Sequence, residues 1–174
     1  MNPLDEPVAL TAYSVDWPVD AALEAARVRR VLEGIDVTVE HIGSTAVPGL
    51  VAKPVIDMQA GLAELLFEEA AMERLVGAGY EDMGEAGVRG RRYLRKRGPD
   101  NFNLHLMQLG GLIWDSNLML RDYLRAHPKA AKEYAAAKRR ALEGGGRLLA
   151  YSDAKAETLK RMLMLATAWA RERR

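Results

Sequence analysis

Over residues 18–113, stretches in which hydrophobic and polar positions alternate are mixed with stretches of helical period. The rear part of the chain, residues 114–174, follows a helical period. Alternation rich in β-branched residues predicts strands at 35–43, 54–61, 80–84, 90–98 and 101–110. Helical spacing predicts one helix from Pro18 to residue 33 and another over 63–76. The rear part predicts three more helices, over 115–127, 128–143 and 152–174, the last with Ser152 or Asp153 as its N-cap.

This order of elements indicates an α+β fold in a single domain covering 1–174. We expect a mixed β-sheet flanked by helices over 18–113. We also expect a helical extension over 114–174, which packs on the sheet part because its helices are amphipathic.

Composition narrows the setting of the protein. The 174 residues are 49% hydrophobic and 28% charged, as in ordinary globular proteins. The net charge of +1 provides no strong attraction to nucleic acid or membranes, so neither is expected as a partner. No cysteine is present, which excludes disulfides, thiolate metal ligands and a cysteine nucleophile. The N-terminal stretch lacks the basic start and apolar core of a signal peptide, and we expect a cytoplasmic protein.

The stretch EHIGSTAVPGLVAKPVIDMQA, residues 40–60, contains the first candidate site. Gly43 and Ser44 directly follow a predicted strand, and a glycine there permits a sharp turn or the close approach of a ligand. The Ser44 hydroxyl and the amides of a following helical turn can hold a phosphate, whose charge Lys53 can neutralise. The alternative is a plain strand connection with a solvated lysine.

Asp57 and Gln59 share one face of the second predicted strand, because they are two residues apart. A Gly-Ser turn before a strand with spaced acids is similar to the skeleton of the nucleotidyltransferase fold. There, paired carboxylates hold divalent metal, and the metal binds a triphosphate. In this chain Gln59 stands where a second acid is expected. Its amide oxygen can ligate a cation but adds no negative charge, which weakens the two-metal hypothesis.

Two of the three histidines are further candidates: His41 lies within this stretch, and His105 lies on the strand predicted over 101–110. His41 ends the strand before the Gly-Ser turn, and His105 shares a strand face with Asn103. If the His105 strand lies beside the Asp57 strand, His41, Asp57 and His105 make a site suited to a transition metal or to acid–base work. The metal ligands would be Asp57, Gln59 and His105. The alternative is a set of structural histidines bonded to backbone carbonyls.

A basic cluster occupies the predicted strand at 90–98. Alternation puts Arg91, Tyr93 and Arg95 on one face, where the arginines can bind an anion and the tyrosine can stack on a base. The alternative is an edge hairpin kept soluble by its charges. Arg91 and Arg95 are the two candidates from this cluster for ligand binding.

The stretch EHIGSTAVPGLVAKPVIDM strongly resembles the signature of the GrpB family. NLHLM, RDYLRAHP, EYAAAK and YSDAKAETLKRMLMLATAW resemble its later blocks in the same order, so that the resemblance runs from Tyr13 to Trp169. The family is classed with the nucleotidyltransferase-like superfamily by fold similarity, and relatives of the domain occur fused to dephospho-CoA kinase. Neither point establishes an activity. The family's motif positions fall here on His41, Gly43, Ser44, Thr45, Pro48, Gly49, Lys53, Pro54, Asp57 and His105.

The resemblance implies a nucleotidyltransferase-fold protein that binds a nucleotide or another phosphorylated small molecule. Mg²⁺ or another divalent metal is the implied cofactor, and nucleotidyl or phosphoryl transfer is the implied reaction. Because Gln59 stands where the second acid is expected, the resemblance leaves open whether this reaction occurs. In this hypothesis Gly43, Ser44 and Thr45 hold phosphate, while Asp57 binds metal or acts as a base.

Two rival functions stay open at this point. One is a non-catalytic binding or accessory module that docks a protein partner through its C-terminal helices. The other is a metal-dependent hydrolase that uses His41, Asp57 and His105.

Overall fold

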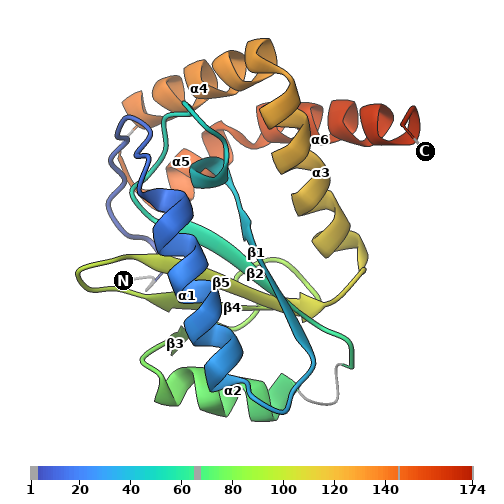
Figure 1. Ribbon diagram of the computed structural model, residues 1–174. Helices are drawn as coiled ribbons and strands as arrows, with labels where there is room; N and C mark the ends of the chain where they lie inside the picture. Colours follow the sequence, from blue (N-terminus) through green and yellow to red (C-terminus); the bar gives the residue numbers. More distant parts are fainter. Residues whose placement is uncertain (1–3, 65–67, 145, 174) are drawn as a thin grey trace.

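The computed structural model describes residues 4–64, 68–144 and 146–173. The chain forms a mixed sheet with helices around it (Figure 1), and the strands stand in the order β1-β2-β5-β4-β3. The central strands β2 and β5 pair in parallel, and the other neighbouring pairs are antiparallel. The strands are β1 Val37–Ile42, β2 Ile56–Leu62, β3 Glu81–Asp82, β4 Arg91–Lys96 and β5 Phe102–Gln108. Each lies where alternation predicts a strand.

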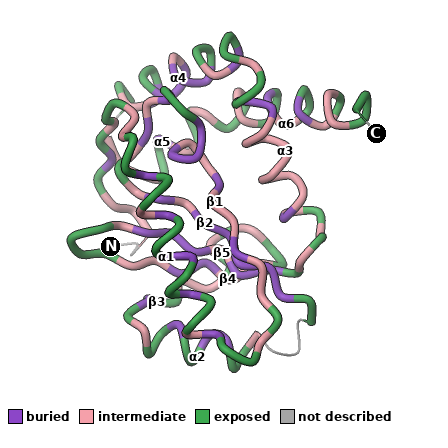
Figure 2. Tube along the Cα trace, viewed as in Figure 1, coloured by how far each residue is buried: buried purple, intermediate pink, exposed green. Residues whose placement is uncertain are grey.

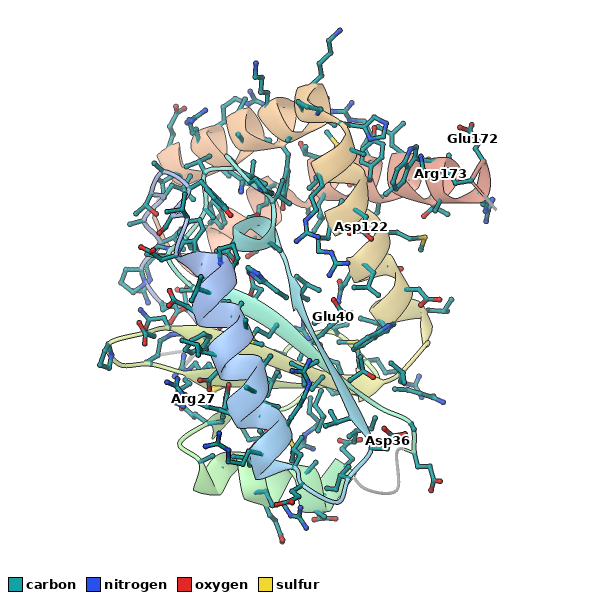
Figure 3. The ribbon with its side chains drawn as sticks, in the orientation of Figure 1. Arg27, Asp36, Glu40, Asp122, Glu172 and Arg173 are labelled. Carbon is teal, nitrogen blue, oxygen red and sulfur yellow. The ribbon has the colours of Figure 1, made fainter. Side chains whose placement is uncertain are left out.

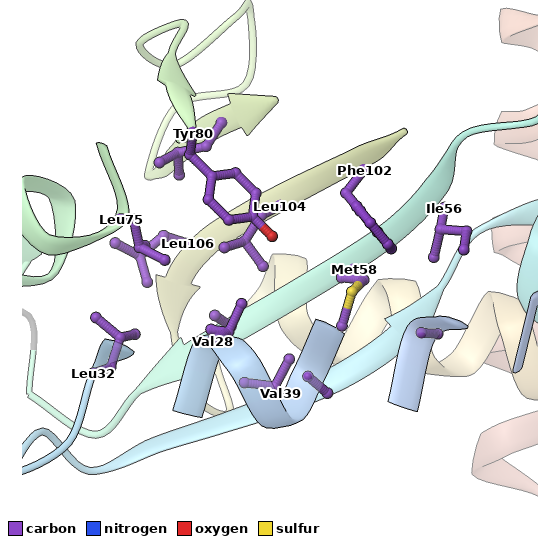
Figure 4. Packing of buried hydrophobic residues seen from close by; sticks show 14 of the residues in the cluster. Val28, Leu32, Val39, Ile56, Met58, Leu75, Tyr80, Phe102, Leu104 and Leu106 are labelled. Atoms are coloured by element: carbon purple, nitrogen blue, oxygen red, sulfur yellow. The ribbon is translucent and has the colours of Figure 1, made fainter. Parts of the chain in front are cut away.

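One face of the sheet is covered by α1 (Trp17–Val31) and α2 (Glu68–Gly77). Alternate strand residues, such as Met58 on β2 and Leu104 on β5, point into this layer and pack against Val28 of α1 (Figure 4). Figure 2 shows the buried stretches along the strands and the exposed outer turns of both helices. Because strand side chains alternate, the intervening residues face the other side of the sheet. The predicted helix over 63–76 includes residues 65–67, which lie outside the described residues.

The rear part of the chain forms α3 (Leu112–Ala126), α4 (Pro128–Glu143), α5 (Leu148–Ala154) and α6 (Ala156–Arg171). Tyr134 and Met162 from these helices pack with Val47 and Leu50, which belong to the connection between β1 and β2. This packing joins the helical part to the connection between β1 and β2. Among the described residues, no helix is long and apolar enough to cross a membrane.

Several helix boundaries differ from the prediction: α1 ends at Val31 and not at residue 33, α2 runs over Glu68–Gly77 and does not include residue 63, and two further differences lie in the C-terminal part. α3 begins at Leu112 with Gly111 at its N-cap, three residues before the predicted start. The single helix predicted over 152–174 is two helices that meet at Lys155, so Ser152 and Asp153 lie inside α5 and are not caps.

The break at Lys155 has a tertiary cause. Tyr151 of α5 is buried against Val8 and Ala141, while Met162 and Ala166 of α6 are buried in the cluster formed with α3 and α4. The two halves therefore pack on different partners. A single straight helix would place both halves on one axis, and it could not pack on both of these surfaces.

One carboxylate lies inside the layer between α1 and the sheet. Glu24 is 1% exposed and accepts hydrogen bonds from Tyr80 Oη at 2.8 Å, Arg27 Nη1 at 2.9 Å and Lys96 Nζ at 3.2 Å. Burial alone would raise the pKa of Glu24, but these donors together lower it below its usual value. Three donors thus stabilise the ionised carboxylate in the core.

Candidate functional site

A pocket of ≈ 440 Å³ lies between the second face of the sheet and the rear helices. Side chains of β2, β4 and β5 form one wall, the turn after β1 forms an edge, and α3 to α6 supply the opposite wall. Six residues predicted from the sequence line it: Gly43, Ser44, Lys53, Asp57, Arg91 and His105.

The turn after β1 passes directly over Asp57. Ile42, the last residue of β1, is the cross-strand partner of Asp57. Gly43 then takes φ +71°, a conformation that residues with a Cβ rarely adopt. A Cβ atom at this position would lie 2.7 Å from Asp57 Oδ2. Glycine is therefore required both for the turn and for its close approach to the carboxylate, and the turn brings Ser44 to the pocket.

Asp57 is held in its ionised form. Its Oδ1 accepts a hydrogen bond of 2.7 Å from Asn103 Nδ2 and lies 3.8 Å from His105 Nε2. Burial alone would raise the pKa of Asp57, but His105, the charge of Lys53 and the Asn103 amide together lower it well below its usual value. The side chain still keeps 28% exposure. An ionised carboxylate is therefore in reach of a ligand in the pocket.

The hydrogen-bond partners of His105 determine which ring nitrogen carries its proton. Arg91 Nη1 lies 3.1 Å from His105 Nδ1. Because a guanidinium group only donates, Nδ1 accepts and the hydrogen is on Nε2, the nitrogen that faces Asp57. Tyr93 stacks on the imidazole with ring centroids 5.2 Å apart. The Tyr93 hydroxyl donates to Asn103 Oδ1 at 2.8 Å, which turns the Asn103 amide toward the same carboxylate.

The pocket wall is rich in cations. Its lining includes Lys53, Arg91, Arg121 and Lys155, and Asp57 is the one carboxylate among the described residues that line it. Burial lowers the pKa of Lys53, although the charge of Asp57 opposes this. The wall therefore carries more positive than negative charge, which favours an anionic ligand.

Two arginines of α3 connect the helical part to the turn. Arg121 Nη1 donates to Glu40 Oε2 at 2.8 Å and to the His41 carbonyl at 3.1 Å. Arg125 Nε donates to the Ala46 carbonyl at 2.7 Å. Figure 3 labels Glu40 on β1 and Asp122 on α3, the two acids that Arg121 bridges. These bonds fix the position of the Gly43–Ser44 turn relative to α3.

Four predicted site residues do not line the pocket: His41, Thr45, Gln59 and Arg95. His41 is the cross-strand partner of Met58 and so lies on the α1 face, where its Nε2 is 2.9 Å from Thr45 Oγ1. Burial lowers the pKa of His41 to about 4. Arg95 pairs with Glu81 at the sheet edge. The set His41, Asp57 and His105 proposed for a hydrolase is therefore not brought together.

Gln59 lies on the same face as Asp57, as predicted, but it is fully buried. Its Oε1 accepts a hydrogen bond of 2.9 Å from Asn117 Nδ2, and its Nε2 donates to the Trp114 carbonyl at 3.4 Å. Both bonds come from the start of α3. The amide oxygen that the sequence offered as a metal ligand is thus used to attach a helix.

The donor set does not fit a pair of divalent metal ions. Mg²⁺ prefers several oxygen ligands, carboxylates above all, and within the described part of the wall only Asp57 supplies one. Asp57 Oδ1 already accepts the Asn103 amide, and His105 faces the Arg91 guanidinium. No group of three or more His, Asp or Glu side chains is placed to hold a metal within the described ranges. The ligands predicted from the sequence, Asp57, Gln59 and His105, do not form such a group.

The helical part supplies pocket residues that sequence reasoning missed. Asn117 and Leu120 come from α3, Tyr134 from α4, Tyr151 from α5 and Lys155 from the junction of α5 and α6. Apolar residues at helical spacing usually indicate a core, and these positions gave no contrary signal. The resemblance of the YSDAKAET segment to a family block was the one pointer to Tyr151 and Lys155.

The sequence matches the family model described as GrpB protein over residues 7–164. The UPF0157 protein YqkA of Bacillus subtilis (strain 168) is 33% identical over 168 residues, which covers 95% of this chain and 49% of that protein. This chain therefore spans about half the length of that relative.

Two solved structures are similar to most of this chain. The crystal structure of the conserved protein GrpB from Enterococcus faecalis has a TM-score of 0.82 at 31% identity and covers 92% of this chain and 99% of that one. The Cid1 poly(U) polymerase bound to MgATP has a TM-score of 0.52 at 14% identity and covers 74% of this chain and 45% of that one. The second likeness is one of fold alone. The architecture is thus nucleotidyltransferase-like, and the chain belongs to the GrpB family.

Proposed function

We propose that this protein binds a nucleotide or another phosphorylated small molecule in the pocket beside the Gly43–Ser44 turn. The observation that carries the proposal is the charge of the wall, where four cationic side chains accompany the single described carboxylate, Asp57. Phosphate groups are small-molecule anions that lysine and arginine bind well. The pocket volume of ≈ 440 Å³ suits a ligand of nucleotide size.

The residues divide into two roles in this proposal. The Ser44 hydroxyl and the cations Lys53 and Arg91 bind the phosphate group. Asp57 and His105 face the part of the ligand that lies beside β2 and β5. A carboxylate with so low a pKa is a poor proton acceptor near neutral pH. Asp57 is therefore better suited to orient a ligand hydroxyl than to remove its proton.

We further propose that the bound ligand undergoes nucleotidyl or phosphoryl transfer. This transfer is supported by the nucleotidyltransferase-like fold and by a carboxylate beside a Gly-Ser turn. The bonds of Gln59 to Asn117 and Trp114 favour a second candidate, a non-catalytic module that binds the same ligand class. An assay for release of pyrophosphate or phosphate from bound nucleotide separates the two, since release supports transfer and binding without turnover supports the module.

Isothermal titration calorimetry tests the binding itself. Nucleoside triphosphates and inorganic pyrophosphate are the probes, and Ser44→Ala and Arg91→Gln are the variants. We expect binding by the native chain and weaker binding by both variants, with no change for Lys132→Gln, which alters an exposed lysine of α4. Absence of binding for every probe would contradict the proposal.

A further inference from the structure

The pocket cations differ in whether a carboxylate already neutralises them. Arg121 pairs with Glu40 and Asp122. Within the described part of the chain, Lys53, Arg91 and Lys155 have no carboxylate within ion-pair distance. These three side chains come from the loop before β2, from β4 and from the α5–α6 junction, and all three line the same space.

Two of these cations, Arg91 and Lys155, are held by groups that leave their charge uncompensated. Arg91 donates to the backbone carbonyls of Glu85 and Ala86 and to the His105 ring. The Lys155 ammonium lies 5.1 Å from the Tyr151 ring centroid and 6.0 Å from that of Tyr134. Carbonyls and aromatic faces orient a cation without neutralising it. The charges are therefore positioned toward the pocket and remain available to an anion.

The groups near Asp57 are arranged against a bound cation. In the parallel pair β2–β5, the residue beside Asp57 is Asn103, and the residue beside Gln59 is His105. Asn103 turns its N–H group, not its oxygen, toward Asp57. A metal ion at this carboxylate would meet that donor and the nearby charge of Lys53.

We infer that this pocket neutralises the anionic group of its ligand with Lys53, Arg91 and Lys155 in place of a divalent metal ion. The inference rests on the proposed function and adds that binding is independent of metal. It also assigns Lys155, which lies where α5 and α6 meet, as a ligand-binding residue. The bend between the two helices is then part of the site, because it places this lysine beside the sheet.

Calorimetric titration of ATP and inorganic pyrophosphate, in excess EDTA and in excess Mg²⁺, tests this inference. We expect the affinity in EDTA to equal or exceed that in Mg²⁺, because the metal competes with the side-chain cations for phosphate charge. Lys53→Gln and Lys155→Gln should each weaken binding about tenfold or more, the loss expected for a charge-assisted hydrogen bond. Lys132→Gln is the matched control on the exposed side of α4.

The outcomes separate the inference from the proposed function. Binding in EDTA that both pocket variants weaken supports the inference. Binding that requires Mg²⁺ and is unaffected by Lys155→Gln would overturn it and leave the proposed function in place. A lack of binding in both conditions would overturn the proposed function as well. Melting temperatures of the variants at or above that of the native chain exclude misfolding as the cause of weaker binding.

Discussion

Each face of the sheet contains an ionised carboxylate, and the two carboxylates differ in their exposure and in how many hydrogen bonds they accept. Glu24, on the α1 face, is 1% exposed and has hydrogen bonds from Tyr80, Arg27 and Lys96. Asp57, on the pocket face, has one short hydrogen bond, from Asn103, and keeps 28% exposure. The Glu24 carboxylate has its hydrogen bonds supplied by the fold, whereas the Asp57 carboxylate can still accept hydrogen bonds from a ligand.

The lysines of the two faces differ in the same way. Lys96 compensates a buried acid, so its charge stabilises the fold. Lys53 and Lys155 line a pocket with a single described carboxylate, and burial together with the charge of Lys155 lowers the pKa of Lys53. Equivalent substitutions on the two faces should therefore change stability in opposite directions.

Gly43→Ala should be the most damaging change on the pocket face. The positive φ costs about 1–2 kcal/mol for a residue with a Cβ, and the contact with Asp57 adds about 1–3 kcal/mol of overpacking. Gly49→Ala is the matched control, since Gly49 also has a positive φ but nothing lies within 4 Å of a Cβ there. Urea unfolding measures both. Equal losses in the two variants would show that the turn does not press on Asp57.

Glu24→Gln should destabilise the fold by about 2–3 kcal/mol, because an amide nitrogen would replace an oxygen that faces buried donors. Binding of ligand in the pocket should not change. Glu33→Gln, at an exposed position two residues after the end of α1, is the control. Chemical denaturation together with a nucleotide titration checks both statements, and a loss of affinity at constant stability would contradict the separation of the two faces.

Lys138→Met should stabilise the protein by about 1 kcal/mol at neutral pH, since an apolar side chain replaces a buried cation that forms no ion pair with a carboxylate among the described residues. Lys138 is 1% exposed, donates to the Val51 carbonyl, and has its pKa lowered by burial from 10.5 to about 7. The lost bond to Val51 limits the gain.

The stability contributed by Lys138 depends on pH, because its pKa is lower in the folded chain than in the unfolded chain. Between pH 7 and 10.5 the unfolded chain binds more protons at Lys138 than the folded chain, so native stability rises with pH across that window. The advantage of Lys138→Met should therefore shrink as pH increases from 7. Urea melts at a series of pH values measure the difference, and an advantage that grows with pH would contradict the assignment.

His41→Asn should have the smallest effect at neutral pH, about 0.5–1 kcal/mol for the bond to Thr45. The folded-state pKa of about 4 lies below the ordinary value of 6.5, so the unfolded chain takes up the proton first. Native stability should fall as pH decreases from 6.5 to about 4, and the variant should lack this component. Matching acid limbs in the two unfolding profiles would rule out a buried neutral His41.

The strands and most helices were predictable because their signals are local. Alternation identifies β1 to β5, and it correctly puts Asp57 with Gln59 and Arg91 with Tyr93 on shared faces. The same alternation also places His41 with Val37 and Val39, the core-facing residues of β1. Alternation alone therefore predicts His41 on the core face. The sequence interpretation placed His41 in the site because it lies two residues before Gly43.

The strands, most of the helices, the family and six residues of the pocket wall follow from the sequence, because strand alternation and motif spacing are short-range properties. Which side chains remain available to bind a ligand depends on tertiary packing. Gln59 is bonded to Asn117 of α3 and does not line the pocket. Lys155 lines the pocket at the break between α5 and α6, and this break depends on two separate packing surfaces. Such outcomes depend on contacts between residues far apart in the chain, and no local pattern encodes them.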